Sequence, residues 1–252
     1  MTSVAPRVSI VVPAYNEGDE ITAFLQRVSA TVTLPFELLV VVDSDDDTTI
    51  PAVDRFHAED DRVRAVVNTF GRGPAQAIRY GFEVAAAPIV VVTMADGSDD
   101  PRQIDSLTEL VERGVVVAAG SRYMAGGQQI GGPRFKRLLS RLAGQSLHLF
   151  ANIGTRDATN SFKAYDADFV RQVTIQSRDG FEIGLELTAK ARRARRAVAE
   201  LPTIWLDRTT GVSNFQLRKW IPKYLRWYRF AFGPALPLDH IAPAAAGRKG
   251  SS

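Results

Sequence analysis

Short β-branched runs alternate with amphipathic stretches over the first half of the chain. The runs at 8–13, 37–43, 64–67, 89–93 and 115–120 are rich in valine, and most of them are almost wholly apolar. Runs of this kind indicate strands that are buried on both faces, as in a parallel sheet.

The stretches between these runs carry helical periodicity. In 19–32, 75–86 and 101–112 the apolar residues recur at spacings of three and four, and the last stretch opens with a proline. Alternating strands and helices predict βαβ units. The predicted fold class is therefore α/β, a doubly wound and mostly parallel twisted sheet with helices on both faces.

After residue 131 the alternation gives way to longer and more basic segments. The predicted segments are a helix at 135–153, a polar loop at 155–165, a helix at 180–193, a late strand at 197–206, an aromatic, basic helix at 216–232 and a flexible tail at 233–252. The aromatic helix has two interpretations. It is either an interfacial membrane helix with its cations on anionic lipid, or a helix packed on its own domain with its cations reaching water.

Composition narrows the chemistry. The chain has no cysteine and three scattered histidines, which exclude disulfides and thiolate sites and argue against a histidine-rich zinc site. Any metal should be a hard cation held by carboxylates. No apolar run reaches the ~18 residues of a membrane span, and the N-terminus lacks the pattern of a signal peptide, so we expect a cytoplasmic protein.

Charge is unevenly distributed. The net charge is only +3, but acidic residues crowd the first hundred positions while arginine and lysine dominate from Arg122 to Arg229. This division suggests one half that binds metal and another that binds anions or a membrane. No nucleic-acid motif accompanies the basic residues, and the acidic clusters would repel a nucleic-acid backbone, so nucleic acid is not an expected partner.

Polar and mostly acidic groups follow four of the predicted strands, and in an open parallel sheet these ends form the ligand-binding edge. Asp96 comes directly after a buried strand and is the best-placed metal ligand. Asp99 either shares the cation or caps the helix that follows. Asp43 is placed to accept a hydrogen bond from a ribose or a base.

The motifs at these strand ends resemble those of family-2 glycosyltransferases of the GT-A type, which have a Rossmann-like fold. They are Pro13-Ala14-Tyr15-Asn16-Glu17, the acidic turn at Asp43, Gly71-Arg72-Gly73 and Ala95-Asp96. The second half is similar to dolichyl- and polyprenyl-phosphate mannose or glucose synthases. The segments that carry this likeness are Gly120-Ser121-Arg122-Tyr123, the helix around Lys136-Arg137 and Ser140, 157–163, Gly180-Phe181-Glu182 and 207–213.

The resemblance implies a role for each matching residue. The nucleotide-sugar donor would be held by Pro13, Tyr15, Glu17, Asp43, Gly71, Arg72, Gly73, Ala95 and Asp96. Mg²⁺ or Mn²⁺ would be bound by Asp96, with Ser98 and Asp99 as further ligands. The phosphates of acceptor and donor would be held by Arg122, Lys136, Arg137, Ser140 and Arg208, and the catalytic residues would be Asp96, Arg122 and Arg208.

Three positions depart from the family pattern. Met94 stands where the paired-aspartate motif has its first acid, and Ser98 is a poorer ligand than the residue of relatives. Asn214 stands where a lysine is common in the acceptor motif. The first two positions leave metal affinity open, and the third leaves the acceptor open.

The resemblance implies an inverting transferase that moves mannose or glucose from a GDP- or UDP-linked donor to a polyprenyl phosphate, peripherally on the cytoplasmic face of a membrane. The alternatives are a family-2 transferase acting on a soluble hydroxyl acceptor and an impaired homologue that binds a nucleotide or a membrane. The expected organisation is a glycosyltransferase domain at 1–212, with a donor half at about 1–120 and an acceptor half at about 121–212. An interfacial amphipathic helix at 213–232 and the tail at 233–252 follow.

Overall fold

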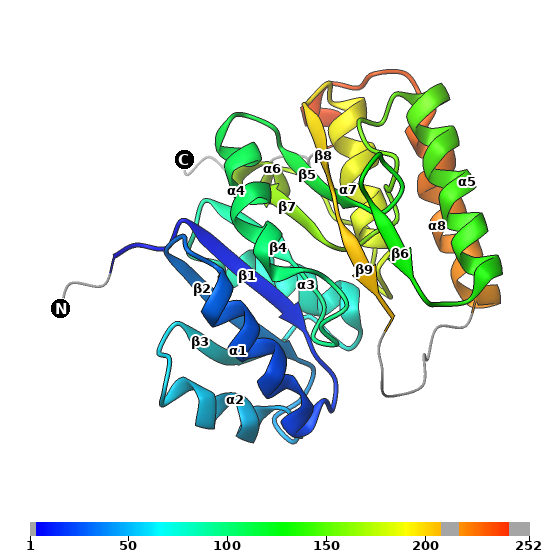
Figure 1. Ribbon diagram of the computed structural model, residues 1–252. Coiled ribbons are helices and arrows are strands. Elements are labelled where there is room, and N and C mark those ends of the chain that lie inside the picture. The colour runs from blue at the N-terminus through cyan, green and yellow to red at the C-terminus, as the bar shows by residue number, and fades with distance from the viewer. Residues whose placement is uncertain (1–3, 208–216, 242–252) are drawn as a thin grey trace, which may run out of the picture.

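The computed structural model describes residues 4–207 and 217–241 of the chain (Figure 1). Its strands are β1 (Val8–Pro13), β2 (Phe36–Val42), β3 (Val63–Val67), β4 (Ile89–Val92), β5 (Val117–Ser121), β6 (Gln128–Ile130), β7 (Lys163–Asp166), β8 (Val198–Pro202) and β9 (Ile204–Leu206). Seven of them form one sheet in the order β3-β2-β1-β4-β7-β5-β8, and β6 pairs with β9 in a second, two-stranded sheet.

The large sheet is mostly parallel, as the apolar runs predict. Strands β1 to β4 are parallel neighbours. The residues of β1, β2 and β4 are almost entirely buried because helices cover both faces, whereas β3 at the edge of the sheet is mostly half-buried. The order reverses at β1, which has β2 on one side and β4 on the other. Such a switch point leaves a crevice at the carboxyl ends of the two strands.

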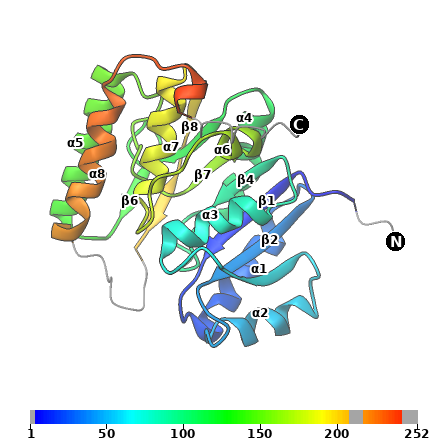
Figure 2. The same cartoon turned by 180° about the vertical axis from the view of Figure 1, so that it is seen from behind.

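The helices are α1 (Ile21–Thr31), α2 (Ile50–His57), α3 (Pro74–Val84), α4 (Ile104–Glu112), α5 (Arg134–Ala151), α6 (Ala167–Gln172), α7 (Glu182–Arg193) and α8 (Leu217–Ala231), with 3₁₀ turns at Gly18–Glu20, Pro101–Gln103 and Leu238–His240. Apolar residues of α1, α2 and α4 share one core with the sheet, and those of α3, α6 and α7 share the other (Figure 2). The fold is therefore a three-layer α/β sandwich.

Two predictions about the second half are wrong. The polar loop expected at 155–165 ends in a strand, because β7 begins at Lys163 and runs antiparallel between β4 and β5. The strand has only four residues and few of them are apolar, so the hydrophobic pattern of the sequence does not reveal it. The late strand expected at 197–206 is two strands, because the chain leaves the large sheet after Pro202 and β9 pairs with β6 instead.

A third core joins α5, α7 and α8, which lie side by side at one end of the molecule (Figures 1 and 2). Gly144 allows α5 to lie close to the backbone of the loop that follows it, because a Cβ at this position would lie 2.0 Å from the carbonyl oxygen of Arg156. Trp227 and Ala231 of α8 are buried in this core. The interpretation of the aromatic helix as one packed on its own domain therefore holds for this face.

Part of the expected flexible tail is packed against the domain. The backbone nitrogen of Leu236 donates to Arg193 and that of Thr174 donates to Ile241, which is buried. Leu236 and Leu238 contact the core formed by α3, α6 and α7. The rest of the expected tail, 242–252, lies outside the described residues.

Candidate active site

The carboxyl ends of β1 and β4 bring the first and the last donor motifs together. The two strands are paired from Ser9 with Val90 to Val11 with Val92, and the backbone nitrogen of Thr93 continues the ladder to Val11 at 3.1 Å. Pro13 and Ala95 are both buried at this edge. The segments after β1 and β4 therefore flank the crevice at the switch point.

Asp43 organises the glycine turn that follows β3. One of its carboxylate oxygens accepts a hydrogen bond from Asn68 Nδ2 at 3.0 Å, and the other accepts one from the backbone nitrogen of Gly73 at 2.7 Å. Gly71 and Gly73 have φ values of +113° and +108°, which side chains with a Cβ rarely adopt. Asp43 thus shapes the turn, and each oxygen retains a lone pair for a ligand.

The segment after β1 is fixed by the loop after β2. The carboxylate of buried Asp47 accepts a hydrogen bond from the backbone nitrogen of Asn16 at 3.1 Å, and Thr49 Oγ1 accepts one from that of Glu17 at 3.0 Å. Tyr15 is left 69% exposed, and Arg72 is also exposed. These contacts hold the backbone after β1 in place. The side chains of Tyr15, in this segment, and of Arg72, in the glycine turn, are exposed.

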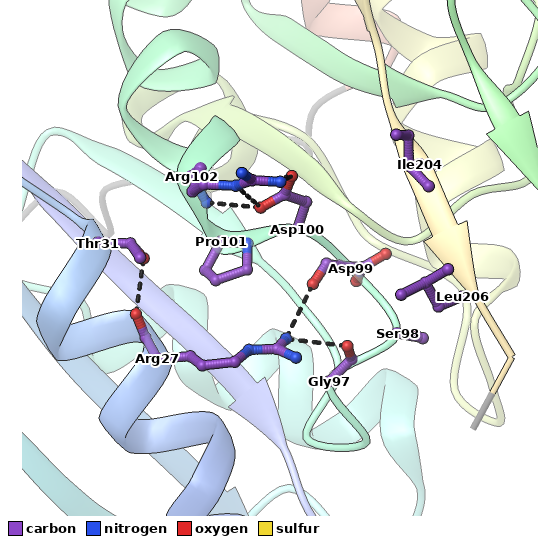
Figure 3. Close-up of a pocket in the computed structure, with 10 residues that line it drawn as sticks. All are labelled: Arg27, Thr31, Gly97, Ser98, Asp99, Asp100, Pro101, Arg102, Ile204 and Leu206. Carbon is purple, nitrogen blue, oxygen red and sulfur yellow. Dashed lines mark hydrogen bonds and ion pairs between the residues drawn. The ribbon is translucent and has the colours of Figure 1, made fainter. Parts of the chain in front are cut away.

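Arg27 of α1 clamps the loop that carries Asp96. Its Nη2 donates to the carbonyl oxygens of Gly97 at 2.9 Å and Asp99 at 3.3 Å (Figure 3). Within the loop, Asp96 Oδ1 accepts a hydrogen bond from the backbone nitrogen of Ser98 at 3.0 Å. The guanidinium group of Arg27, which no sequence motif marks, therefore fixes the conformation of this loop.

Asp99 is buried inside the same loop. It is 3% exposed, and its Oδ2 accepts hydrogen bonds from Thr93 Oγ1 at 3.1 Å and from the backbone nitrogen of Met94 at 3.4 Å. Burial, together with the nearby charge of Asp96, raises the pKa of Asp99 to about 7. Asp99 therefore places a carboxyl group beside position 94, where the family's first acid is missing.

A pocket of about 360 Å³ lies behind this loop, between α1 and β9. The lining residues include Gly97, Ser98 and Pro101 from the loop segment and the apolar side chains of Ile204 and Leu206 from β9 (Figure 3). Among the described residues, Ser98 Oγ and Asp99 Oδ1 are buried without a hydrogen-bond partner. The loop therefore keeps two oxygen atoms available next to Asp96.

Arg122 follows β5 at the same edge and is held by a buried acid. Its Nε and Nη2 bind the two carboxylate oxygens of Asp157 at 2.7 and 2.9 Å, and its backbone nitrogen binds Oδ2 at 3.0 Å. The side chain of Asp157 is fully buried and that of Arg122 is 12% exposed. This ion pair fixes the direction of the guanidinium group, which is close enough to Asp99 for their charges to interact.

Tyr123 connects Arg122 to α5. Its hydroxyl donates to Gln129 Oε1 at 3.1 Å, and its ring lies 5.1 Å from the Arg122 guanidinium. The charges of Arg122 and Arg137 and a hydrogen bond with Ser140 counteract the rise in the pKa of Tyr123 that burial causes. Three of the five predicted phosphate-binding residues therefore surround one tyrosine.

The other two predicted phosphate-binding residues are placed differently. Lys136 is exposed on α5, on the outer surface of the helix. Arg208 lies outside the described residues, as does most of the motif at 207–213 that carries it. The structure thus brings together Arg122, Arg137 and Ser140.

Lys163, the first residue of β7, is a buried cation in the same region. Its Nζ donates to the carbonyl oxygens of Ala158, at 3.1 Å, and of Asn160. Burial lowers the pKa of Lys163 from 10.5 to about 7, which the charge of Asp157 opposes. The folded protein therefore binds this proton more weakly than the unfolded chain does.

This difference predicts a specific pH dependence. Between pH 7 and 10.5 the unfolded chain binds more protons at this position, so stability should rise with pH in this range, by up to about 1.4 kcal/mol per pH unit. We expect Lys163→Met to lose this contribution, as measured by urea unfolding at pH 7 and pH 9.5. The exposed Lys136→Met variant is the control, and equal slopes for wild type and Lys163→Met would contradict the prediction.

The family model for glycosyl transferase family 2 matches residues 9–174, which include β1 to β4 and the Asp96 loop. The chain belongs to glycosyl transferase family 2. This match covers the predicted donor half from residue 9 onward, and the family-2 transferase continues beyond it with α7, β8, β9 and α8.

Curated relatives of this family-2 transferase include two enzymes with lipid acceptors in their names. The polyprenol monophosphomannose synthase of Mycolicibacterium smegmatis is 28% identical over 230 residues, covering 88% of this chain and 86% of the relative. The undecaprenyl-phosphate mannosyltransferase of Micrococcus luteus is 28% identical over 214 residues, covering 82% and 87%. The transferase is thus similar in length and sequence to polyprenyl-phosphate mannosyltransferases.

A solved structure with a similar fold is glucosyl-3-phosphoglycerate synthase from Mycobacterium tuberculosis, in complex with Mn²⁺, UDP and glucosyl-3-phosphoglycerate. It superposes with a TM-score of 0.64 at 18% identity, covering 89% of this chain and 78% of the other. At this identity the likeness shows the GT-A-like fold of the family-2 transferase.

The sequence alone assigns no role to several residues that lie in the candidate site. Arg27 lies on a helix far from any motif, so no signal singles it out. Asp157 and Lys163 belong to a recognised segment, but their burial and pairing cannot be seen in a polar stretch. Tyr123 stood beside Arg122 in the sequence, and its contact with Gln129 was not predictable from that position.

Proposed function

We propose that this family-2 transferase moves mannose or glucose from a GDP- or UDP-linked donor to a polyprenyl phosphate at a membrane surface. The observation that carries the proposal is the arrangement at the switch point. The acidic loop with Asp96 lies on one side, and Arg122, held by Asp157, lies on the other with Arg137 and Ser140 nearby. The names of the relatives support the same acceptor class.

The residues present fit a divalent cation. Asp96 supplies a carboxylate, and the unpartnered Ser98 Oγ and Asp99 Oδ1 are oxygen atoms that a hard cation prefers. Mg²⁺ and Mn²⁺ sites of this kind use few protein ligands, since phosphates and water complete the coordination. When bound, Mg²⁺ or Mn²⁺ would neutralise charge on the donor diphosphate. The likeness to a structure that contains Mn²⁺ supports this assignment.

A phosphate acceptor suits this site because it needs no strong general base. A phosphate monoester is already an anion at neutral pH, with its second pKa near ~6. The chain then has to position the nucleophile and stabilise the leaving diphosphate. Arginine offers planar paired donors to phosphate oxygens, and Arg122 is oriented in advance by its ion pair. In-line attack would invert the anomeric configuration.

The outer face of α5 supports a membrane surface as the place of reaction. Phe135, Leu138, Leu142, Leu149 and Phe150 are each more than half exposed, although they are large and apolar. Arg134, Lys136 and Arg141 are exposed on the same helix. An apolar stripe flanked by cations is typical of a helix that lies on anionic lipid. No helix in the described part of the chain is long and apolar enough to cross a membrane.

This assignment moves the expected interfacial helix. The aromatic residues Trp227, Tyr224 and Tyr228 of α8 are buried or half-buried against α7 and α5, which supports the interpretation of a helix packed on its own domain. Ile221 and Leu225 of α8 remain exposed. We therefore assign the membrane contact mainly to α5, with the outer face of α8 beside it.

The membrane contact predicts the effect of one charge on α5. We expect Leu142→Glu to reduce sedimentation with vesicles of phosphatidylcholine and phosphatidylglycerol by about 10-fold, because an apolar contact is lost and anionic lipid repels the new carboxylate. Gln172→Glu adds the same charge on α6 and should leave vesicle binding unchanged. Equal vesicle binding by both variants would contradict the assignment of α5 as the membrane contact.

The function itself is tested by incubation with radiolabelled GDP-mannose, UDP-glucose and related donors, together with Mn²⁺ and a polyprenyl phosphate. The expected product is an anionic glycolipid extracted into organic solvent. A polyprenyl alcohol serves as the matched acceptor without phosphate. Transfer to the alcohol at the same rate would overturn the phosphate acceptor.

Two other functions give distinct results. A transferase for a soluble hydroxyl acceptor would need a base among Asp99, Asp100 and Glu182, and conversion of that acid to its amide would abolish turnover while donor binding persists. A non-enzymatic homologue would bind a nucleoside diphosphate in calorimetric titration without Mn²⁺ and would hydrolyse no donor.

A further inference from the structure

Glu182 is a buried carboxyl group that the proposed chemistry does not use. It is the first residue of α7 and is 2% exposed. Its Oε1 accepts a hydrogen bond from the backbone nitrogen of Gly180 at 3.3 Å. Its Oε2 is also buried, and no described residue donates a hydrogen bond to it. Since buried polar atoms are almost always hydrogen-bonded, Oε2 requires a donor that the described residues do not supply.

The surroundings place Glu182 near both halves of the proposed site. The loop before α7 touches the glycine turn on the donor side, where a Cβ on Gly73 would lie 3.0 Å from the carbonyl oxygen of Asp179. On the other side is Tyr224 of α8. Burial raises the pKa of its hydroxyl, and the charges of Glu182 and Arg122 are close enough to raise and to lower that pKa, respectively. Figure 2 shows α7 and α8 adjacent, with α3 opening from the donor turn on the same side of the sheet.

We propose that Oε2 of Glu182 accepts a hydrogen bond from a hydroxyl group of the transferred hexose and so contributes to the choice of sugar. This inference rests on the proposed function. The hexose links the donor diphosphate to the acceptor, so it must pass between the glycine turn and Arg122. Glu182 is near both of these groups, through Asp179 on the side of the glycine turn and Tyr224 on the side of Arg122.

The chemistry of the carboxylate selects this ligand. A carboxylate only accepts hydrogen bonds, so its partner must be a donor. The phosphate of the acceptor and the oxygens of the diphosphate are themselves acceptors, and a polyprenyl chain has no donor at all. We assign the ribose and base to the turn at Asp43, whose carboxylate binds the backbone nitrogen of Gly73. The hydroxyls of the hexose are the donors that remain.

The test pairs variants of Glu182 with donors that lack one hydroxyl group. Wild type, Glu182→Ala and Glu182→Gln are assayed with the nucleotide sugar that supports transfer and with its 2-, 3-, 4- and 6-deoxy analogues. For wild type, one analogue should lose about 10- to 100-fold in kcat/KM, the range for a hydrogen bond to a charged group. Glu182→Ala should lose a similar factor on the natural donor and should no longer distinguish it from that analogue.

Stability separates this role from a structural one. Because no described residue donates a hydrogen bond to Oε2, Glu182→Gln should melt no lower than wild type in the absence of donor, while it loses turnover. A lower melting temperature would mean that the carboxyl group holds the fold together, which contradicts the inference. Asp168→Asn removes an exposed carboxylate from the first turn of α6 and should leave turnover unchanged.

The remaining outcomes distinguish the inference from the function beneath it. If wild type transfers sugar and Glu182→Ala loses the same factor with every donor, no hydroxyl is recognised and only the inference fails. It also fails if Glu182→Gln abolishes turnover with an alcohol acceptor alone, because Glu182 is then a general base. If no nucleotide sugar supports transfer by wild type, the proposed function fails and the inference with it.

Discussion

Replacing Asp96 with alanine should lower kcat/KM by about 10³-fold while the protein stays folded. The carboxylate is the principal anchor that we propose for the cation on the donor diphosphate, and loss of one such charge-stabilising contact typically costs 10²- to 10³-fold or more. Asp96 also accepts a hydrogen bond from the backbone of Ser98, so Asp96→Asn, which keeps an oxygen there, should preserve the loop and still lose most activity.

A binding measurement isolates the metal from the chemistry. Mn²⁺ with GDP or UDP should raise the melting temperature of wild type, because a ligand of the native state stabilises it by mass action, and Asp96→Ala should lose most of this rise. Asp100→Asn is the matched control. Asp100 lies four positions further along the same loop, but its carboxylate binds Arg102 instead. If Mn²⁺ with GDP or UDP raises the melting temperature of Asp96→Ala as much as that of wild type, Asp96 is not the metal anchor.

Replacing Arg122 with alanine should destabilise the fold by about 3–5 kcal/mol, because it leaves the fully buried carboxylate of Asp157 without its partner. Two of the three hydrogen bonds from Arg122 to Asp157 come from the guanidinium group and would be lost, and only the one from the backbone nitrogen would remain. Urea unfolding measures this loss. An Arg122→Ala protein within about 1 kcal/mol of wild type would show that the ion pair is not required for stability.

Further variants separate the structural role of Arg122 from its proposed role in catalysis. Arg122→Ala with Asp157→Ala should be more stable than Arg122→Ala alone, because no buried charge is then left unpaired. Arg122→Lys keeps the charge without the planar pair of donors, so it should lose activity even at temperatures where it is folded. Full activity of Arg122→Lys would contradict oriented phosphate binding.

Much of the donor half follows from local sequence alone. The runs of valine and isoleucine predict β1 to β4 because such runs are stable only when buried on both faces. The placement of Asp43 and Asp96 at one edge then follows from parallel topology, since the carboxyl ends of parallel strands share an edge. Family membership confirms the enzyme class that the same motifs suggest.

The second half was harder to predict because its contacts join residues far apart in sequence. β7 is inserted antiparallel between β4 and β5, and nothing in the short run from Lys163 to Asp166 specifies its neighbours. The aromatic residues of α8 looked suited to lipid, but a helix sequence does not show which face its neighbours cover. Packing against α7 and α5 decided that Trp227 lies inside.

The sequence by itself determined that Asp96 follows a buried strand, that position 94 has no acid and that basic residues gather in the second half. Only the tertiary structure decided that Asp99 lies beside Met94, that Asp157 orients Arg122, and that Glu182 is buried with an oxygen unpartnered among the described residues. The reason is physical. Strand and helix patterns reflect local burial, whereas the pairing of charges depends on which distant segments share a low-dielectric interior.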